Sequence, residues 1–591
     1  MNFLKRVLST VVGIGVFCGL CFFFLILIGA LIGGDKKDKI TIEPNSVLAL
    51  NLDEDMPDYA GNFDYGELNE LFKGSKKYTG LFNVIDAINY AATDDNIKGI
   101  SIENNTLSAG MAQTKALRDA LLEFKKSGKF IVAYGDVIGQ KDYYLNSVAD
   151  EIYLNPAGAL DFKGLATEIL YYKDFQEKYG LKMEVIRHGK YKSAVEPYLA
   201  QEMSEANREQ ISVFLNSIWN EMKKEINTSR QIDVAQLDTI ADNLLARSPK
   251  MAVTAKLIDK LIYVDEFNTI INQKLGLSDN DSHEQVDIYE YAKYAAGKNR
   301  IKQFKTEDHI AVIYAQGQIM YGEGDENEIG QGVINHALKV AREDDAIKAI
   351  VLRVNSPGGS ALASELIWRE IELTKAVKPV IVSMGNLAAS GGYYIACNAN
   401  KIIAEPSTIT GSIGVFGTLP NAHDFMNDIG INAEQVTTNK NSVDYSVFEP
   451  MTEAQRAFIK EGVVDIYNLF THRVATGRGM TQDAVDAIAQ GRVWTGADAL
   501  NIGLVDELGG LDVALQYAAE AAELDNYKLK ELPVYDKDFE KMIESFGLFQ
   551  TKEDILKDEL GDYNYRILEK MKTISEMEGT QALLPFEITI K

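Results

Sequence analysis

Cysteine and histidine are scarce in this sequence of 591 residues, and each shortage removes a class of site. The three cysteines cannot form a disulfide framework, because Cys18 and Cys21 lie in one apolar run and Cys397 stands alone far from them. The six histidines are scattered and show none of the short spacings typical of metal sites. We therefore expect neither a bound metal nor a cofactor.

Positive charge is also in short supply. The 60 lysines and arginines are outnumbered by 86 aspartates and glutamates, which gives a formal net charge of −26. Such a surface repels a phosphate backbone, so nucleic acid is not an expected partner. With 46% hydrophobic and 25% charged residues the chain is globular, and its length predicts two or more domains.

No charged residue occurs between Val7 and Gly34, a stretch dense in valine, phenylalanine, leucine and isoleucine. About 20 apolar residues are enough for a helix to cross a bilayer. The apolar part of a cleaved signal peptide is usually shorter, about 7–15 residues. We therefore predict an uncleaved N-terminal membrane anchor within residues 1–40. Basic residues flank both ends of the run, so charge alone does not settle its orientation.

An internal repeat is the strongest sign of how the chain is organised. Residues 94–100 (Asp-Asp-Asn-Ile-Lys-Gly-Ile) match residues 344–350 (Asp-Asp-Ala-Ile-Lys-Ala-Ile), and a Tyr-Tyr pair at 143–144 matches one at 393–394, at a constant shift of 250 residues. Each copy alternates short apolar strands with amphipathic helices, which predicts an α/β fold with a mostly parallel sheet. The predicted boundaries are a first repeat at 41–275, a linker at 276–308, a second repeat at 309–523 and a helical tail at 524–591.

Two turns of the second copy carry residues suited to attack on a carbonyl. Ser390 lies where an apolar strand is expected to turn into a short helix, and a Gly-Gly pair at 358–359 follows another apolar strand. A serine at such a turn can act as a nucleophile, and a Gly-Gly turn can bring backbone N–H groups to the resulting oxyanion. In the first copy Gln140 replaces the serine, and Leu-Ser-Ala at 107–109 replaces Pro-Gly-Gly. The first copy therefore lacks a nucleophile of its own.

A serine hydroxyl needs a base to take its proton. His336 and His423 lie in no pattern typical of a catalytic histidine, so we expect them to be surface or packing residues. A lysine can serve instead if burial lowers its pKa from its ordinary value of about 10.4. Lys190 and Lys192 of the first copy are candidates, although composition alone favours solvated loop lysines at both positions.

The motifs together resemble the signal peptide peptidase A (protease IV) family, in its long two-copy form. They are Asn-Ser-Pro-Gly-Gly-Ser at 355–360, Ala-Ala-Ser-Gly-Gly-Tyr-Tyr at 388–394, Thr-Gly-Ser-Ile-Gly-Val-Phe-Gly at 410–417, Tyr-Lys-Ser-Ala-Val-Glu-Pro at 191–197 and Gly-Arg-Val-Trp-Thr-Gly at 491–496. The resemblance extends from the anchor to about residue 525. It implies a serine peptidase with a Ser/Lys dyad.

The resemblance also assigns the roles. Ser390 is implied as the nucleophile, Lys192 as the general base and acid, and Ser412 as the serine that orients the lysine. The implied oxyanion hole consists of backbone N–H groups of Gly359 and Gly391, with Gly358 as a further candidate. Lys440 lies near the place equivalent to Lys192 in the second copy, but the Tyr-Lys-Ser-Ala-Val-Glu-Pro pattern is absent there, so we expect a loop lysine.

Fold, partners and location follow from the same resemblance. It implies a tandem of two Clp/crotonase-like domains, the first supplying the lysine and the second the serine, preceded by one transmembrane helix. It further implies that the protein cleaves left-over signal peptides and other peptides, that it forms a homo-oligomer with a tetramer expected, and that it lies in the bacterial inner membrane with its catalytic part on the periplasmic side. Two alternatives are a crotonase-like acyl-CoA enzyme and a non-catalytic membrane scaffold.

Overall fold

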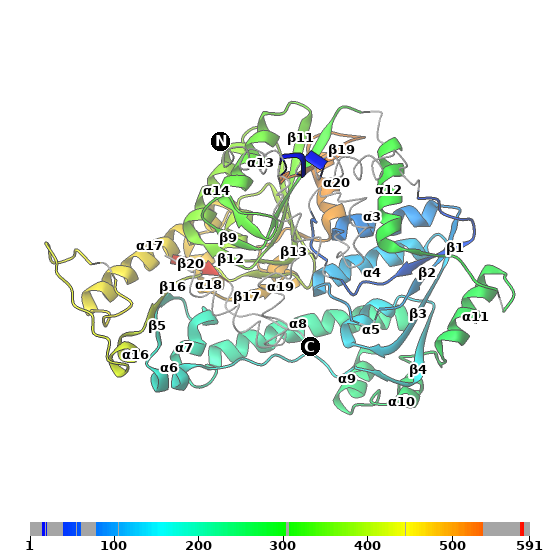
Figure 1. Ribbon diagram of the computed structural model, residues 1–591, viewed down its shortest axis with the longest axis horizontal. Helices are drawn as coiled ribbons and strands as arrows, with labels where there is room; N and C mark the ends of the chain where they lie inside the picture. Colours follow the sequence, from blue (N-terminus) through cyan, green and yellow to red (C-terminus); the bar gives the residue numbers. More distant parts are fainter. Residues whose placement is uncertain are drawn as a thin grey trace, which may run out of the picture.

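The computed structural model describes residues 40–535 and 580–583, except residues 55, 61–78, 105, 280, 303–305 and 444, together with a few residues between Gly13 and Leu20. Within this part of the chain, no helix is both long and apolar enough to cross a bilayer. The anchor predicted within residues 1–40 lies almost entirely outside the described residues. Figure 1 shows the first half of the chain in blue and cyan beside the second half in green to orange.

A parallel sheet forms the centre of the first half. Its order is β6 (Lys260–Leu261), β4 (Glu151–Leu160), β3 (Phe130–Ile138), β2 (Ile97–Ile102), β1 (Ser46–Leu50) and β7 (Gln285–Asp287). Alternate residues of β1 face opposite sides, as the pleat of a strand requires. Val47 packs with Phe267 of α11 (Val264–Leu275), whereas Leu48 packs in the cluster that contains Val84 of α3 (Leu81–Thr93). Helices therefore cover both faces, which explains why the central strands β1, β2 and β3 are mostly apolar.

The second half repeats this sheet. Its order is β17 (Val493–Thr495), β15 (Ile409–Gly411), β13 (Val380–Ala389), β11 (Ile347–Ser356), β8 (His309–Gln316) and β19 (Lys528–Leu532), with β14 (Lys401–Ala404) and β18 (Glu507–Leu508) beside it. The equivalent strands are also neighbours in both sheets: Ile100 of β2 lies opposite Ile131 of β3 in the first, and Ile350 of β11 lies opposite Val380 of β13 in the second. The shift of 250 residues read from the sequence therefore relates two copies of one α/β unit.

Each copy extends further along the chain than the predicted boundaries. β7 pairs with β1, and β19 pairs with β8 in the equivalent place. The predicted linker at 276–308 therefore contains a strand of the first sheet, followed by α12 (Ile288–Lys302), which packs against α3. In the predicted helical tail, the described residues 524–535 and 580–583 form strands β19 and β20 (Thr580–Leu583) and contain no helix. The Lys-Leu-Lys-Glu-Leu sequence of β19 is short and charged, as edge strands often are. It therefore lacks the apolar run from which the other strands were predicted.

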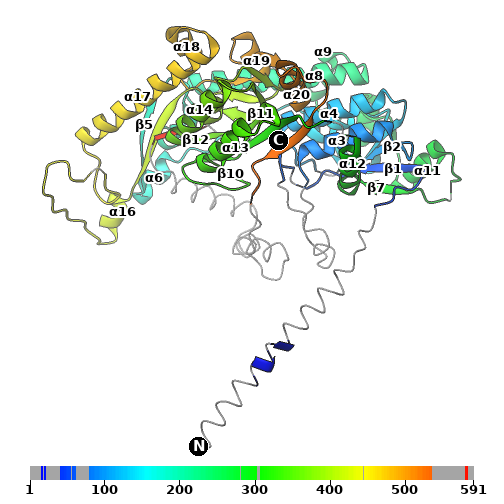
Figure 2. The same cartoon turned by 90° about the horizontal axis from the view of Figure 1, so that it is seen from above.

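A third sheet contains strands from both halves. Its order is β10 (Glu328–Gly330), β9 (Gln318–Met320), β12 (Gly358–Ser360), β20, β16 (Val415–Asn421) and β5 (Lys182–His188). Strand β5 belongs to the first half, yet it pairs along its whole length with β16 of the second, from His188 opposite Val415 to Lys182 opposite Asn421. The two strands lie side by side at the end of the molecule near α16 (His423–Asp428) (Figures 1 and 2). This pairing carries the residues that follow β5 to the second half.

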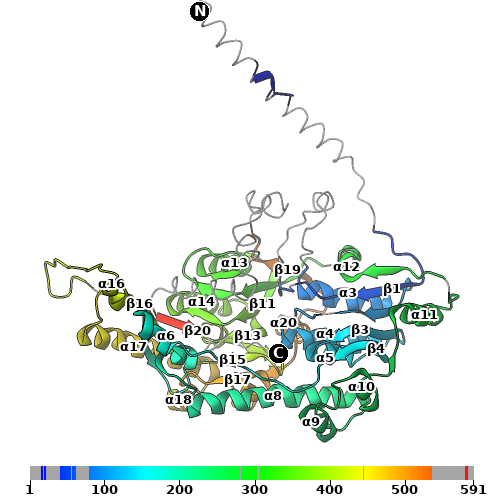
Figure 3. The same ribbon diagram turned by 60° about the horizontal axis from the view of Figure 1, so that its bottom comes forward.

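A long helix also connects the halves. Helix α8 (Glu205–Arg230) spans both halves along one edge of the molecule (Figure 3). Its Ser204 cap accepts a hydrogen bond from the N–H of Asn207, as the Thr452 cap of the equivalent helix α17 (Glu453–Arg478) does from Gln455. The side chain of Ser217 on α8 lies 2.9 Å from that of Thr495 in the second half. The helix therefore holds the two copies in one arrangement.

A buried ion pair joins the halves near their centre. Oδ2 of Asp58 lies 2.9 Å from Nε of Arg353 on β11, and the two side chains are 2% and 4% exposed. Arg353 also donates to Ser383 Oγ at 2.8 Å, and Gln113 donates to Asp58 at 3.0 Å. Buried charges are tolerated when they are paired and hydrogen-bonded in this way.

Replacing Asp58 by alanine should lower the free energy of unfolding by about 3–5 kcal/mol, because Arg353 would keep a buried charge without its partner. Urea denaturation followed by circular dichroism measures the change. The control is Asp424→Ala, which removes the partner of Lys182 in a pair whose side chains are 47% and 46% exposed. That substitution should cost less than about 1 kcal/mol. Equal losses in the two variants would contradict the role of the Asp58–Arg353 pair in joining the halves.

Candidate functional site

Ser390 lies at a strained turn between β13 and α15 (Gly391–Ala396). Its φ is 55° and its ψ is −113°, a conformation that is rare for a residue with a side chain. The N–H of Ser390 donates to the carbonyl of Gly411 at 2.8 Å, and its own carbonyl accepts from Tyr394. The turn is thus fixed on both sides, and the Ser390 hydroxyl makes no capping hydrogen bond to the helix that follows.

Lys192 reaches this serine from the first half of the same chain. It lies four residues beyond β5, and the strand pairing of β5 with β16 delivers it to the second half. Nζ of Lys192 lies 2.9 Å from Oγ of Ser390, 3.0 Å from Oγ of Ser412 and 3.1 Å from the carbonyl oxygen of Ser412. The structure therefore brings together all three side chains that the sequence singled out.

Burial decides the protonation state of this lysine. Lys192, Ser390 and Ser412 are each 0% exposed. Among the described residues no carboxylate forms an ion pair with Lys192, whose ammonium would have only neutral oxygens around it. Burial away from water therefore lowers the pKa of Lys192 well below its usual range. A neutral amine next to a serine hydroxyl can accept its proton, which a charged lysine cannot do.

Ser412 occupies a second turn of unusual conformation. Its φ is 50°, and its N–H donates to the carbonyl of Arg492 at 2.7 Å. The turn presents both the hydroxyl and the carbonyl of Ser412 to the same amine. Two acceptors on one residue fix where Nζ lies relative to Ser390.

The glycines of the second copy lie beside the serine turn. Gly358 has a φ of 99° and Gly359 a φ of 155°, values that favour glycine. A Cβ on Gly358 would lie 2.7 Å from the nitrogen of Gly391, so glycine is needed for these backbones to approach. The N–H of Gly358, however, donates to Ser356 Oγ at 3.1 Å. Gly359 and Gly391 are therefore the better candidates for an oxyanion hole.

Gly414 and Gly491 pack closely against Lys192, a role that was not predicted from the sequence. A Cβ on Gly491 would lie 2.6 Å from the backbone nitrogen of Lys192, and one on Gly414 would lie 3.2 Å from Cδ of that lysine. The N–H of Tyr191 also donates to the carbonyl of Gln490 at 2.8 Å. These two glycines leave room for the lysine to be enclosed. Their presence in two of the motifs was the available signal.

The other candidate bases lie elsewhere. Lys190 and Lys440 are exposed, and so is His336. Nδ1 of His423 lies 2.9 Å from the carbonyl oxygen of Phe448 on the surface. The expectation that these four are surface or loop residues agrees with where the structure places them.

Gln140 occupies the turn of the first copy that is equivalent to the Ser390 turn. It begins α5 (Gln140–Asn146), as Ser390 precedes α15. Its Oε1 accepts hydrogen bonds from the N–H groups of Lys163 and Gly164, at 2.9 Å and 2.8 Å, and its Nε2 donates to the carbonyl of Gly164 at 3.0 Å. Gly164 corresponds to Gly414 at the repeat shift of 250. The glutamine thus ties together the loop that, in the second copy, adjoins Ser390.

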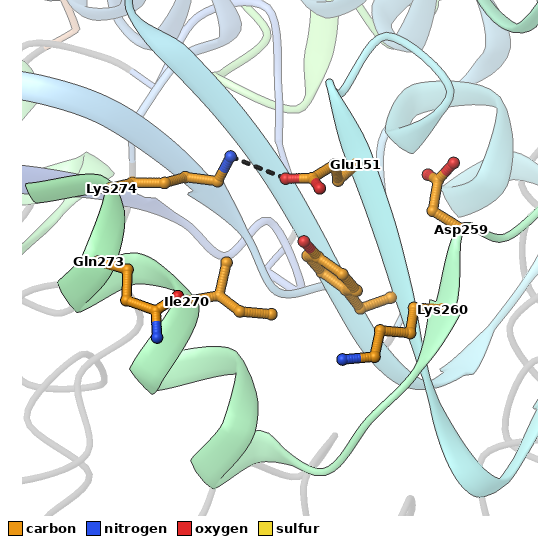
Figure 4. Close-up of a pocket in the computed structure, with 7 residues that line it drawn as sticks. Glu151, Asp259, Lys260, Ile270, Gln273 and Lys274 are labelled. Atoms are coloured by element: carbon orange, nitrogen blue, oxygen red, sulfur yellow. Dashed lines mark ion pairs between the residues drawn. The ribbon is translucent and has the colours of Figure 1, made fainter. Parts of the chain in front are cut away.

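An open pocket of about 550 Å³ lies apart from this site, in the first half (Figure 4). It lies between β4, β6 and α11 and is lined by Glu151, Tyr153, Asp259, Lys260, Ile270, Gln273 and Lys274. Glu151 and Lys274 form an ion pair across it at 2.7 Å. None of the predicted site residues lines this pocket.

Both halves of this chain are similar to known proteins of one family. The family described as "Peptidase family S49" matches residues 123–278 and 372–525, one match in each half. "Protease 4" of Salmonella typhi is 37% identical over 529 residues, which cover 86% of this chain and 84% of that protein. "Protease 4" of Haemophilus influenzae is 35% identical and covers 85% of this chain and 83% of its own.

Two further proteins are similar to this chain. "Serine protease SPPA, chloroplastic" of Arabidopsis thaliana is 35% identical over 440 residues, 73% of this chain and 64% of that protein. Among solved structures, a ClpP1 mutant from Listeria monocytogenes aligns at 15% identity over 34% of this chain and 91% of that one, with a TM-score of 0.23, too low to identify the fold. The two family matches and the alignment with two bacterial proteases over most of the chain place this protein in peptidase family S49, as a serine peptidase.

Proposed function

We propose that this peptidase hydrolyses peptide bonds through an acyl-enzyme, with Ser390 as nucleophile and Lys192 as general base. The observation that carries the proposal is the contact of 2.9 Å between Nζ of Lys192 and Oγ of Ser390, in a site closed to water. Ser412 orients the amine through its two acceptors. The mechanism uses no histidine or carboxylate, because burial lowers the pKa of Lys192 and favours its neutral form.

In the first step Lys192 takes the proton of Ser390 while Oγ attacks the carbonyl carbon of the peptide. The oxyanion that forms is stabilised by backbone N–H groups, for which Gly359 and Gly391 are the candidates. A preorganised donor of this kind is typically worth about 3–4 kcal/mol in the transition state. Lys192 then gives its proton to the leaving amine of the peptide. The neutral side chain of Lys192 next activates a water molecule, which hydrolyses the acyl-enzyme.

The resemblance to signal peptide peptidase A extends the proposal to fold, substrate and place. Each half is expected to have a Clp/crotonase-like fold. The substrates are expected to be signal peptides left after secretion, and other peptides. We further propose a single N-terminal transmembrane helix, a location in the bacterial inner membrane with the catalytic part on the periplasmic side, and a homotetramer.

The first prediction of the proposed mechanism concerns the dyad. Ser390→Ala and Lys192→Ala should each lower kcat for an unstructured peptide by at least about 100-fold, since nucleophile and base act in the same step. Both variants should remain folded by circular dichroism. Lys190→Ala is the matched control and should retain wild-type kcat. Turnover at the wild-type rate by Lys192→Ala would contradict the dyad. Loss of labelling by a serine-directed phosphonate in Ser390→Ala would exclude a crotonase-like reaction without a serine nucleophile.

The second prediction concerns the pH dependence of activity. Only neutral Lys192 can accept the proton, so kcat/KM should rise about tenfold per pH unit below the lowered pKa of this lysine and then level off well before its ordinary value near 10.5. The measurement is kcat/KM between pH 5 and pH 10, with pre-steady-state kinetics as the control for changes in substrate binding. A profile that still rises at pH 10 would mean that the lysine pKa is not lowered.

The third prediction concerns stability. The pKa of Lys192 is lower in the folded than in the unfolded protein, so the unfolded protein binds more protons between those two values. Lys192 therefore makes the folded state more stable as pH rises through that window, by at most about 1.4 kcal/mol per pH unit. Lys192→Met lacks this dependence. The free energy of unfolding of the variant minus that of the wild type should fall as pH increases from 7 to 10. A constant difference would contradict a neutral, buried lysine.

A further inference from the structure

The turn that carries Lys192 rests on Gln210, a residue of the long helix α8. Gln210 is only 1% exposed, although glutamine is usually found at the surface. Its Nε2 lies 3.1 Å from the carbonyl oxygen of Tyr191, 3.1 Å from Oγ of Ser193 and 3.0 Å from Oδ1 of Asn207. The residues on either side of Lys192 are therefore both within hydrogen-bond distance of one amide.

The oxygen of the same amide contacts strand β17 of the second half. Oε1 of Gln210 accepts a hydrogen bond from the N–H of Val493 at 3.4 Å. The carbonyl of Arg492, the residue before Val493, accepts from the N–H of Ser412 at 2.7 Å. Ser412 in turn presents the two acceptors that fix Nζ of Lys192. One side chain thus links the turn that carries the amine to the strand that positions its acceptors.

The stretch of chain that Gln210 holds is also the one that encloses Lys192. A Cβ on Gly491 would lie 2.6 Å from the backbone nitrogen of Lys192, so the two backbones are in direct contact. Removing the amide of Gln210 would take a hydrogen-bond partner from the N–H of Val493 and from the carbonyl of Tyr191. A buried polar group that loses its partner costs about 1–3 kcal/mol. Water that enters to replace the amide would therefore arrive directly behind the lysine.

Hydration, and not charge, is what Gln210 can control at this amine. The charged and titratable side chains packed around the turn are Arg187, His188, Lys190, Glu196 and the ion pair of Arg492 with Glu209. Among the described residues none of them forms an ion pair with Lys192, and burial is the cause that lowers the pKa of this lysine. Methionine is similar to glutamine in length and is likewise uncharged. Gln210→Met therefore removes the hydrogen bonds and leaves the charges around the turn as they are.

We propose that Gln210 is a positioning residue for the reaction: its amide clamps the Lys192 turn to β17 and thereby keeps water from the amine. The inference rests on the proposed function, in which Lys192 is the base. It adds that the base is maintained by a side chain on α8, the helix that spans both halves. Gln210 acts through Lys192 and Ser412 and touches neither substrate nor Ser390.

The first test is the pH profile of kcat/KM for an unstructured peptide, measured on the full-length protein with and without Gln210→Met. Water beside Lys192 would favour its charged form, so the acid limb of the profile should move about one pH unit higher. On that limb kcat/KM should fall about tenfold, whereas the plateau at higher pH should change less than about threefold. An acid limb that stays in place, whether or not the plateau falls, would overturn the inference.

Ser217→Ala is the matched control, because Ser217 lies on the same helix. Its Oγ lies 2.9 Å from Oγ of Thr495, a contact between the halves that does not involve the Lys192 turn. Both substitutions remove a contact of α8 with the second half, so both should lower the free energy of unfolding. Only Gln210→Met should move the acid limb. An equal movement in Ser217→Ala would mean that Gln210 acts through general stability, and would contradict the clamp.

A second measurement follows the amine without catalysis. The protein is labelled with ¹³C at Cε of lysine, and the resonance of Lys192 is the one that Lys192→Met removes. Its chemical shift is recorded between pH 6 and pH 10, and its midpoint should lie at higher pH in Gln210→Met than in the wild type. The same midpoint in both proteins would overturn the inference. A higher midpoint in the variant, together with no peptide turnover by the wild type, would instead contradict the proposed function and leave the clamp established.

Discussion

A lysine side chain enclosed without a counter-charge is the constraint on which the rest of this structure depends. In the proposed mechanism Lys192 can accept the proton of Ser390 only while its side chain is kept from water, because hydration would favour its charged form. Several otherwise unrelated features serve that enclosure. They include the pairing of β5 with β16, the glycine at 491 that allows the backbone of Lys192 to approach, and the left-handed turn at Ser412. The reactive pair is thus a product of packing between halves, and no local stretch of chain contains it.

The repeat gives the two copies different tasks at equivalent positions. In the second copy the turn after β13 contains Ser390, and the neighbouring loop contains Gly414. In the first copy the same turn holds Gln140, whose side chain makes three hydrogen bonds to the equivalent loop. The same local geometry therefore holds the proposed nucleophile in one copy and a hydrogen-bonded structural side chain in the other. The first copy contributes to the site through β5 and Lys192.

The sequence predicted what depends on local patterns. The repeat, its parallel sheets and the serine turn could be inferred from apolar runs and glycine pairs that lie within a few residues of each other. Lys192 could be selected over Lys190 only through the family motif, since burial is a tertiary property and composition favours exposure of both. The hydrogen bond from the N–H of Gly358 to Ser356, and the strands β19 and β20, could not be foreseen, because they depend on partners distant in the chain.

The pairing of β5 with β16 has a consequence for biosynthesis. Lys192 and Ser390 are 198 residues apart, and the strand that presents the lysine has no partner until residues 415–421 have been made. A growing chain that has completed only its first copy therefore contains Lys192 without Ser390. In the proposed mechanism, peptidase activity begins only after the second copy has been synthesised and β5 has paired with β16. The architecture thus places the assembly of the proposed dyad late in translation.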